Sequence, residues 1–256
     1  MKKIVAVIAD IHGNLEALES ILKDIETQNI EEIICLGDTI DIGPNSKECL
    51  DLLIRNNVKS VLGNHEIYLL NGTVFDPSIV GEEKKHYDWV KKSLTSEEVD
   101  YLKKSPLYYE INIDYEDSKF NKKIVLCHYL INDEKASYPF ELNNLKDDIS
   151  LWKKYNDDNI TYFIGHLHNS FDVNEVEGIV GDYIEDDGTL TNIVVVDSCG
   201  CRKDEYTSYM ILEISKSIKY ETRKVKYDRD KFVNKILSYD FPDKRNILKY
   251  FYGIEM

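Results

Sequence analysis

The chain has 256 residues and a formal net charge of −15, with 32 lysines and arginines against 47 aspartates and glutamates. A chain of this length can bury a sizeable core, and its negative charge argues against a long polyanion such as duplex DNA as a partner unless metal ions invert the local field. Five cysteines, an odd number, and the lack of any apolar run near the roughly 18 residues of a membrane span indicate a reduced, cytoplasmic protein without a membrane partner.

Strands and helices are expected to alternate through the first third of the chain. The apolar run Ile4 to Ala9 predicts a strand, and apolar side chains recur at helical spacing over 15–28. A second strand at 33–36 precedes a helix at 46–56, and a third unit begins at 58–62. This order is typical of βα units in a mostly parallel sheet.

The remainder mixes further strands and helices. Two helices are expected between 80 and 105, and Thr95 with Glu98 forms a capping-box signal for the second. Further strands are expected at 107–115, 124–127, 161–164, 193–197, 209–214 and 218–225, with 193–197 and 209–214 as neighbours. A helix candidate spans 149–155, and the acidic stretch 175–187 is interpreted as a solvated hairpin.

Two helices are expected over 230–253, with Gly253 ending the second. We find no linker, repeat or low-complexity tract in the sequence. We therefore expect one domain spanning 1–256, with these C-terminal helices packed on it.

Potential metal ligands follow the apolar runs at their carboxyl ends. They are Asp10, His12, Asp38, Asn64, His65, His128, His166 and His168. Residues after different strands of a parallel or mixed sheet can converge at one edge. Carboxylate, imidazole and amide oxygen together suit Mn²⁺, Fe, Zn²⁺, Co²⁺ or Ni²⁺. The set is too large for one transition ion, so two ions about 3.5 to 4 Å apart, bridged by a carboxylate, would use it well.

These residues resemble the motifs of the calcineurin-like metallophosphoesterases. The five blocks of that family, D-x-H, G-D, G-N-H-D/E, a histidine after a strand and G-H-x-H, correspond in order to Asp10–His12, Gly37–Asp38, Gly63–Glu66, His128 and Gly165–His168. The resemblance covers essentially the whole chain. It implies a four-layer α/β sandwich, with two mixed sheets packed face to face and helices outside.

The resemblance also implies a role for each motif residue. Asp10, His12 and His168 would hold a first metal, Asn64, His128 and His166 would hold a second, and Asp38 would bridge them. His65 would face the substrate as a general acid or oxyanion stabiliser. The implied reaction is phosphoester hydrolysis by a water or hydroxide shared between the two metals, and it needs no organic cofactor.

The branch of the family is left open. The two histidines of Gly165–His168 and the Gly43-Pro44-Asn45 segment resemble small bacterial phosphodiesterases, whereas Asp41, Glu66 and the segment 196–200 resemble bacterial phosphoprotein phosphatases. In the phosphatase branch the aspartate at the position of Asp41 orients the catalytic histidine. The alternative for Asp41 is a loop carboxylate that caps the next helix or faces water.

Two positions depart from the phosphatase branch. Ile42 stands where that branch has a phosphate-binding arginine, and Tyr129 stands where a glycine is usual, which suggests a narrower pocket. Arg202 could replace the missing guanidinium, and the alternative is an ordinary surface arginine. Tyr129 and Arg202 are therefore candidate substrate-binding residues.

The predicted function is metal-dependent phosphoester hydrolysis by a phosphatase or phosphodiesterase. Possible substrates are small molecules, nucleotides such as dinucleoside polyphosphates, and serine/threonine phosphoproteins. A catalytically silent protein-binding scaffold and a structural or sensory metal protein are the alternatives of another class. All the ligand positions are filled, which argues against a scaffold; the oligomeric state is left open.

Overall fold

The computed structural model describes residues 2–72, 79–113, 122–130, 159–168, 193–215 and 217–255. The predicted helix at 149–155 and the predicted acidic hairpin at 175–187 lie outside these residues.

The first sheet has five strands in the order β3-β2-β1-β8-β9. They are β1 (Lys3–Ile8), β2 (Glu32–Cys35), β3 (Lys59–Ser60), β8 (Tyr206–Ile214) and β9 (Ile218–Lys226). The first three are parallel, as the βα units predict, whereas β8 and β9 continue the sheet in antiparallel pairing. The sheet is therefore mixed.

Helices α1 (Leu15–Ile25) and α2 (Ser46–Arg55) cover the outer face of this sheet. Leu18 and Ile21 of α1 lie on the helical stripe and pack against Ile8 of β1 in one buried cluster. Asn14 begins α1, because its side-chain oxygen accepts a hydrogen bond of 3.1 Å from the backbone of Ala17.

The second sheet has four strands in the order β4-β5-β6-β7. They are β4 (Tyr108–Ile113), β5 (Lys122–Cys127), β6 (Ile160–Ile164) and β7 (Ile193–Val195). Strands β5, β6 and β7 are parallel, and β4 is antiparallel to β5.

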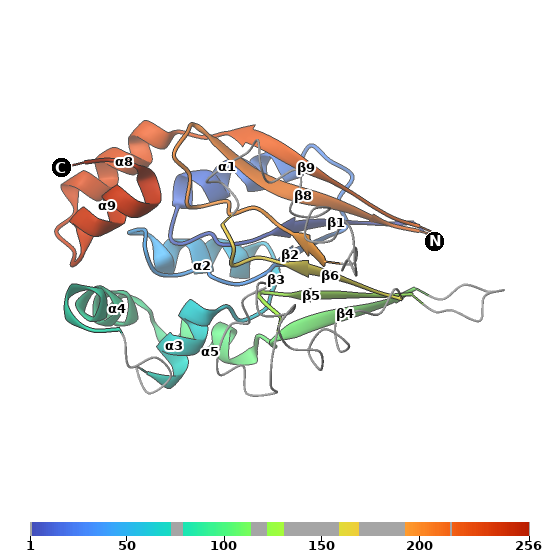
Figure 1. Cartoon of the computed structure of the whole chain (residues 1–256), viewed down its shortest axis with the longest axis horizontal. Coiled ribbons are helices and arrows are strands. Elements are labelled where there is room, and N and C mark those ends of the chain that lie inside the picture. Colours follow the sequence, from blue (N-terminus) through green and yellow to red (C-terminus); the bar gives the residue numbers. More distant parts are fainter. Residues whose placement is uncertain are drawn as a thin grey trace, which may run out of the picture.

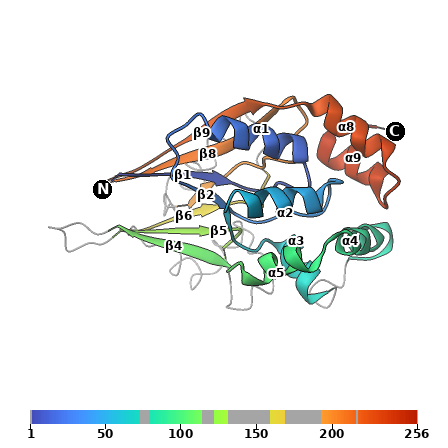
Figure 2. The ribbon, with the colours of Figure 1, turned by 180° about the vertical axis from the view of Figure 1, so that it is seen from behind.

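The two sheets pack face to face around one apolar core (Figures 1 and 2). Val5 and Val7 of the first sheet share this core with Ile124, Leu126 and Phe163 of the second. The predicted sandwich of two mixed sheets flanked by helices is confirmed. Among the described residues, the apolar cluster on the outer face of the second sheet includes no helical residue.

The expectation that 193–197 and 209–214 form neighbouring strands is wrong. Strand β7 pairs with β6 in the second sheet, whereas β8 pairs with β1 in the first. The connecting loop crosses between the sheets, and its backbone bonds Cys199 to Ala9 and Gly200 to Asp10, both at 2.9 Å. Both segments are apolar, so either sheet could bury them. The local sequence therefore does not indicate that they belong to different sheets.

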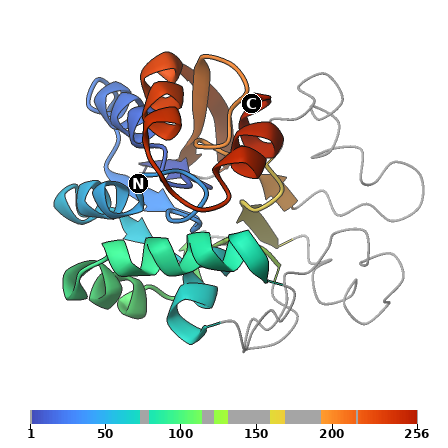
Figure 3. The same cartoon turned by 90° about the vertical axis from the view of Figure 1, so that its left-hand side faces the viewer.

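The remaining helices gather at the end of the sandwich toward which the parallel strands point (Figures 1 and 3). They are α3 (Asn64–Asn71), α4 (Gly81–Ser93), α5 (Ser96–Lys104), α8 (Arg229–Ser238) and α9 (Lys244–Tyr252). The capping box of α5 is confirmed, and α9 ends at Gly253 in the left-handed conformation. None of the described helices combines the length and apolar character that crossing a bilayer requires.

The C-terminal helices are tied to the rest of the fold by apolar contacts. Phe232 and Ile236 of α8 share a buried cluster with Ala17 of α1 and with Ile42. Between α8 and α9, Phe241 stacks on Trp89 of α4 with ring centroids 5.4 Å apart. The C-terminal pair therefore contacts both the loop after β2 and helix α4.

Candidate metal centre

The loops that follow β1, β2, β5 and β6 meet at one edge of the sandwich and bond to one another. The backbone N–H of Asp10 donates to Gly37 O at 3.1 Å, and that of His12 donates to Asp38 O at 2.9 Å. In the second sheet, the N–H of Gly165 donates to His128 O at 2.9 Å. These bonds continue the hydrogen-bond ladders of the strands. They therefore fix the position of each loop, and of the ligand side chains it carries, relative to the neighbouring loop.

Unusual backbone conformations concentrate in the same loops. Most of the described non-glycine residues with positive φ belong to them: Asp10, His12, Asp38, Asp41, Ile42, His166 and His168. Such conformations persist only where the surroundings hold them, and they are typical of functional sites. Gly63 allows a close approach to the Asp38 loop, because a Cβ there would lie 2.1 Å from Asp38 Oδ1.

Four of the predicted ligands form a first group at this edge. Asp10, His12, Asp38 and His168 can each offer one ligand atom with all four atoms within 4.8 Å of one another. His12 Nε2 lies 3.0 Å from His168 Nε2, which in turn lies 3.2 Å from Asp10 Oδ1. Asp10, His12 and Asp38 are buried, so the group is largely shielded from solvent.

A second group shares Asp38 with the first. Asp38, His128 and His166 offer ligand atoms within the same 4.8 Å limit. His128 Nε2 lies 3.2 Å from Asp38 Oδ2 and 3.0 Å from Asn64 Oδ1, so Asn64 belongs beside this group. Asp38 is therefore the one residue common to both groups, and the structure brings all seven predicted metal ligands together.

The hydrogen bonds of His12 and His128 show that these donors fit a metal. His128 Nδ1 lies 2.8 Å from Leu36 O, and His12 Nδ1 lies 3.2 Å from Ile40 O. A carbonyl oxygen only accepts, so each Nδ1 carries the proton and each Nε2 presents a lone pair toward Asp38. A lone pair that faces a carboxylate at such a distance is stabilised when a cation, either a metal ion or a proton, lies between them.

The pKa shifts agree with this arrangement. Burial and then His168 lower the pKa of His12 to about 3, and burial and then His128 lower the pKa of His166 to about 4. Both rings are therefore neutral at neutral pH, which is the form that binds metals. Burial opposes ionisation of Asp38, but His128 and His65 hold its pKa well below the usual range. Burial likewise opposes the charged form of His128, but Asp38 raises its pKa, so a cation is favoured at its Nε2.

His65 and Asp41 form a close pair beside the two ligand groups. His65 Nδ1 lies 2.7 Å from Asp41 Oδ2, while His65 Nε2 lies 3.8 Å from Asp38 Oδ2. Burial favours the neutral ring, but Asp38 and Asp41 raise the pKa of His65 to about 9. Asp41 is buried, and α2 begins at Asn45, so Asp41 is neither a water-facing carboxylate nor the cap of the next helix.

Glu66 organises the Asp38 loop, a role that the sequence motif alone did not indicate. Its Oε1 accepts from the N–H groups of Thr39 at 2.7 Å and Ile40 at 3.3 Å. Its Oε2 accepts from Asp38 at 2.8 Å and Gly63 at 2.9 Å. One buried carboxylate therefore binds four backbone donors from two loops. Its position in the first turn of α3 was the available signal, because glutamates there commonly accept from the backbone at the start of the helix.

The two candidate substrate-binding residues lie differently from the metal ligands. Arg202 is 2% exposed, its guanidinium pairs with Asp197 at 2.5 Å, and its Nε donates to Tyr206 O at 2.8 Å. Its donors are thus directed into the protein, and we do not include Arg202 in the proposed site. Tyr129 is also buried, and its ring lies 5.2 Å from that of His128, so it packs against the second ligand group.

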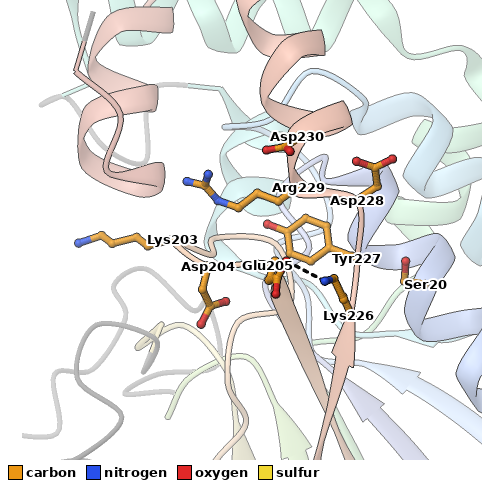
Figure 4. A pocket seen from close by; sticks show the side chains of 9 residues that line it. All are labelled: Ser20, Lys203, Asp204, Glu205, Lys226, Tyr227, Asp228, Arg229 and Asp230. Carbon is orange, nitrogen blue, oxygen red and sulfur yellow. Dashed lines mark ion pairs between the residues drawn. The ribbon is translucent and has the colours of Figure 1, made fainter.

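A separate cavity of about 620 Å³ lies where the end of β9 and the start of α8 face the loop at 203–205 (Figure 4). Acidic and basic side chains are mixed around it. Lys226 pairs with Glu205 at 2.9 Å, and Arg229 donates to Tyr252 O at 2.8 Å. The cavity includes none of the predicted ligands and plays no part in the proposed site.

Two mixed sheets with a histidine and aspartate cluster at their shared edge define the metallophosphoesterase type of α/β sandwich. The chain belongs to the calcineurin-like phosphoesterase family, which its residues 4–191 match.

The chain is similar to three further proteins. An uncharacterized protein of Methanocaldococcus jannaschii is 32% identical over 263 residues, which cover 95% of this chain and 96% of that protein. A metallophosphoesterase of Sphaerobacter thermophilus has the same fold, with a TM-score of 0.65 at 20% identity over 98% of this chain and 99% of that one. The symmetrical bis(5'-nucleosyl)-tetraphosphatase of Buchnera aphidicola is 32% identical over 128 residues, which span 47% of this chain and only 41% of that protein.

Proposed function

We propose that this protein is a phosphoester hydrolase that uses two metal ions bridged by Asp38. The observation that carries the proposal is that Asp38 belongs to both ligand groups while the His65–Asp41 pair stands beside them. In this proposal Asp10, His12 and His168 hold one ion, and Asn64, His128 and His166 hold the other. The donor set suits Mn²⁺, Fe, Zn²⁺, Co²⁺ or Ni²⁺.

The residues of the chain have separate tasks in the proposed reaction. Two cations at this site would activate water for attack on phosphorus and offset charge on the phosphoryl oxygens. Without metal, Asp38 and Asp41 raise the pKa of His65 to about 9, and Asp41 Oδ2 lies 2.7 Å from its Nδ1 and accepts the Nδ1–H. The Nε2–H is then free to donate to the leaving oxygen, which is the task of a general acid.

A proton donor of this kind matters most for leaving groups that are strong bases, which favours phosphomonoesters of ordinary alcohols as one substrate class. A dinucleoside polyphosphate is the second candidate, because a relative named as a symmetrical bis(5'-nucleosyl)-tetraphosphatase matches nearly half of this chain. A phosphoserine or phosphothreonine protein remains an alternative within the monoester class.

Substrate assays with added Mn²⁺ test the proposal. We expect hydrolysis of p-nitrophenyl phosphate, and its rate relative to bis-p-nitrophenyl phosphate separates a monoesterase from a diesterase. A phosphoserine peptide and diadenosine tetraphosphate extend the comparison, and products identified by chromatography show which bond breaks. If the metal-loaded protein hydrolysed none of the four compounds, the silent scaffold would be the better interpretation.

Two variants test the assigned roles. Asp38→Asn should lose bound metal, measured by elemental analysis of the purified protein, because it removes the proposed bridge. His65→Ala should retain both metals but lose about 10²- to 10⁴-fold in turnover of a poor leaving group, the usual range for a general acid. Wild-type turnover by His65→Ala would remove this histidine from the mechanism.

A further inference from the structure

His86 of helix α4 contacts the Asp41 carboxylate from the side opposite His65. Its Nε2 lies 3.0 Å from Asp41 Oδ1, whereas His65 Nδ1 lies 2.7 Å from Asp41 Oδ2. Each carboxylate oxygen therefore faces one imidazole, and Oδ1 also accepts from the backbone N–H of Ile42 at 2.9 Å. The His86 side chain is 4% exposed, so water does not compete for this contact.

Both ring nitrogens of His86 face groups that accept hydrogen bonds. Nδ1 lies 3.1 Å from the carbonyl oxygen of Pro242, between α8 and α9. Nε2 stands at ion-pair distance from Asp41, outside the angle of a well-formed hydrogen bond, and has no other partner among the described residues. The ring is therefore held between two acceptors, one on each side.

The surrounding packing holds this ring in place. Trp89, one helical turn along α4, stacks on His86 with centroids 5.7 Å apart, and Phe241 lies 5.2 Å away on the C-terminal segment. The next residue, Tyr87, donates its hydroxyl to the backbone oxygen of His65 at 3.1 Å. Two consecutive residues of α4 therefore contact the two members of the catalytic pair.

We infer that His86 is a positioning residue for the His65–Asp41 pair. Its Nε2 edge holds Asp41 Oδ1, so that Oδ2 is presented to His65 and the Nε2–H of His65 faces the leaving group. The inference rests on the proposed role of His65 as proton donor. It also gives the C-terminal helices a function, because Pro242 anchors the ring that orients Asp41.

Two amide variants separate the two contacts of His86. In His86→Gln the amide nitrogen takes the place of Nε2 and can donate to Asp41, but the Pro242 contact is lost. In His86→Asn the amide nitrogen takes the place of Nδ1 and can donate to Pro242, but nothing reaches Asp41. Each variant keeps one contact and loses the other, so each is the control for the other.

Kinetics with two leaving groups show whether Asp41 is oriented. We expect His86→Asn to lower kcat for phenyl phosphate about tenfold, with KM changed less than about twofold and with little effect on p-nitrophenyl phosphate, whose leaving group needs less protonation. His86→Gln should restore at least half of the wild-type kcat. In an Asp41→Asn background, His86→Asn should cost less than about twofold more, because its target is gone.

A second readout does not depend on turnover. Nitrogen-15 NMR of the histidine side chains, recorded without added metal, should show the His65 Nδ1–H protected by Asp41 in the wild type and in His86→Gln. The same proton should exchange faster in His86→Asn. Thermal unfolding and metal content of each variant show whether any change merely follows lost stability.

Distinct outcomes overturn the inference. Equal loss of kcat in both variants, in proportion to their lost stability, would make His86 only a structural link between α4 and the C-terminal helices. An unchanged kcat and an unchanged His65 proton in His86→Asn would also overturn it. If the wild type hydrolyses no phosphoester, the proposed function fails, yet the NMR comparison still decides whether His86 orients Asp41.

Discussion

Glu66→Gln replaces one oxygen of the carboxylate that receives four backbone N–H groups in the Asp38 loop. In either orientation of the amide, its NH₂ group faces two backbone donors that were hydrogen-bonded in the wild type. If the amide nitrogen replaces Oε2, the N–H groups of Asp38 and Gly63 lose their acceptor. If it replaces Oε1, those of Thr39 and Ile40 lose theirs. Two buried donors are therefore left without partners.

The expected cost follows from these bonds. Hydrogen bonds to charged groups contribute about 1.5–3 kcal/mol each, so two of them correspond to about 3–6 kcal/mol of the free energy of unfolding. This is a large part of the roughly 5–15 kcal/mol that stabilises a typical domain. The same change loosens the loop that carries Asp38, so metal content should fall with stability.

Glu98 provides a matched control, because it is also a buried glutamate in the first turn of a helix. Its Oε2 accepts from the backbone and hydroxyl of Thr95, and its Oε1 pairs with Lys47 at 3.1 Å. An amide in Glu98→Gln can still accept from the Thr95 backbone, so we expect a loss of about 1 kcal/mol and unchanged metal content.

Urea unfolding followed by circular dichroism, in EDTA, measures the stability of both variants without a contribution from bound metal. Elemental analysis of protein purified without EDTA measures metal content separately. If Glu66→Gln unfolded within about 1 kcal/mol of the wild type and kept its metals, the four contacts would not hold the loop, and our reasoning would be refuted.

Three further tests concern other parts of the structure. Gly63→Ala should displace Asp38 and lose metal, because the added Cβ would lie 2.1 Å from the Asp38 carboxylate. Gly72→Ala is the control, because a Cβ there meets nothing within 4 Å. It should retain metal and lower the free energy of unfolding by about 1–3 kcal/mol, because Gly72 has a positive φ. Arg202→Met should lose about 1.5–3 kcal/mol because it breaks an ion pair in which Asp197 is only partly buried, while KM stays within about twofold. A large rise in KM would return this arginine to the substrate site. Arg223 donates a hydrogen bond of 2.9 Å to Asp24, and this bond lowers the pKa of the Asp24 carboxyl despite partial burial. The pair therefore stabilises the fold above about pH 4, and its contribution is lost as pH falls. The stability gap between wild type and Asp24→Asn should narrow from about pH 6 to about pH 3 in urea titrations.

The ligand positions could be predicted from sequence because their signal is local. Each ligand comes directly after an apolar run, as His128 follows β5 and Asp10 closely follows β1. The carboxyl ends of parallel strands lie at the same edge of one sheet, so the grouping of ligands within each sheet needed no long-range information. The alignment of the two sheet edges was implied by the family resemblance. The same reasoning predicted that Asp38 lies among them, and the structure places it between the two groups.

The contacts that hold the catalytic pair could not be predicted in this way. His86 lies in a helix, and its partner Pro242 is 156 residues away, so neither spacing nor periodicity links them. Arg202 follows a strand in a loop, as a substrate-binding residue would, but its buried pairing with Asp197 depends on the crossing between the two sheets. Burial of a charged side chain is decided by its neighbours in space, which the local pattern does not contain.

Ile42 shows how the helices after β9 alter the site without touching the metal ligands. Asp41 and Ile42 both have positive φ, and from this turn Asp41 contacts His65 while Ile42 enters the apolar cluster with Phe232 and Ala17. An arginine at position 42, as in the phosphatase branch, would place its charge in this cluster at a cost of several kcal/mol. The isoleucine therefore belongs to the packing of the C-terminal helices. Within the part of the chain that the structure describes, a substrate phosphate would then meet the two proposed cations and His65, which makes the orientation of His65 by Asp41 and His86 more important than it would be beside an arginine at this position.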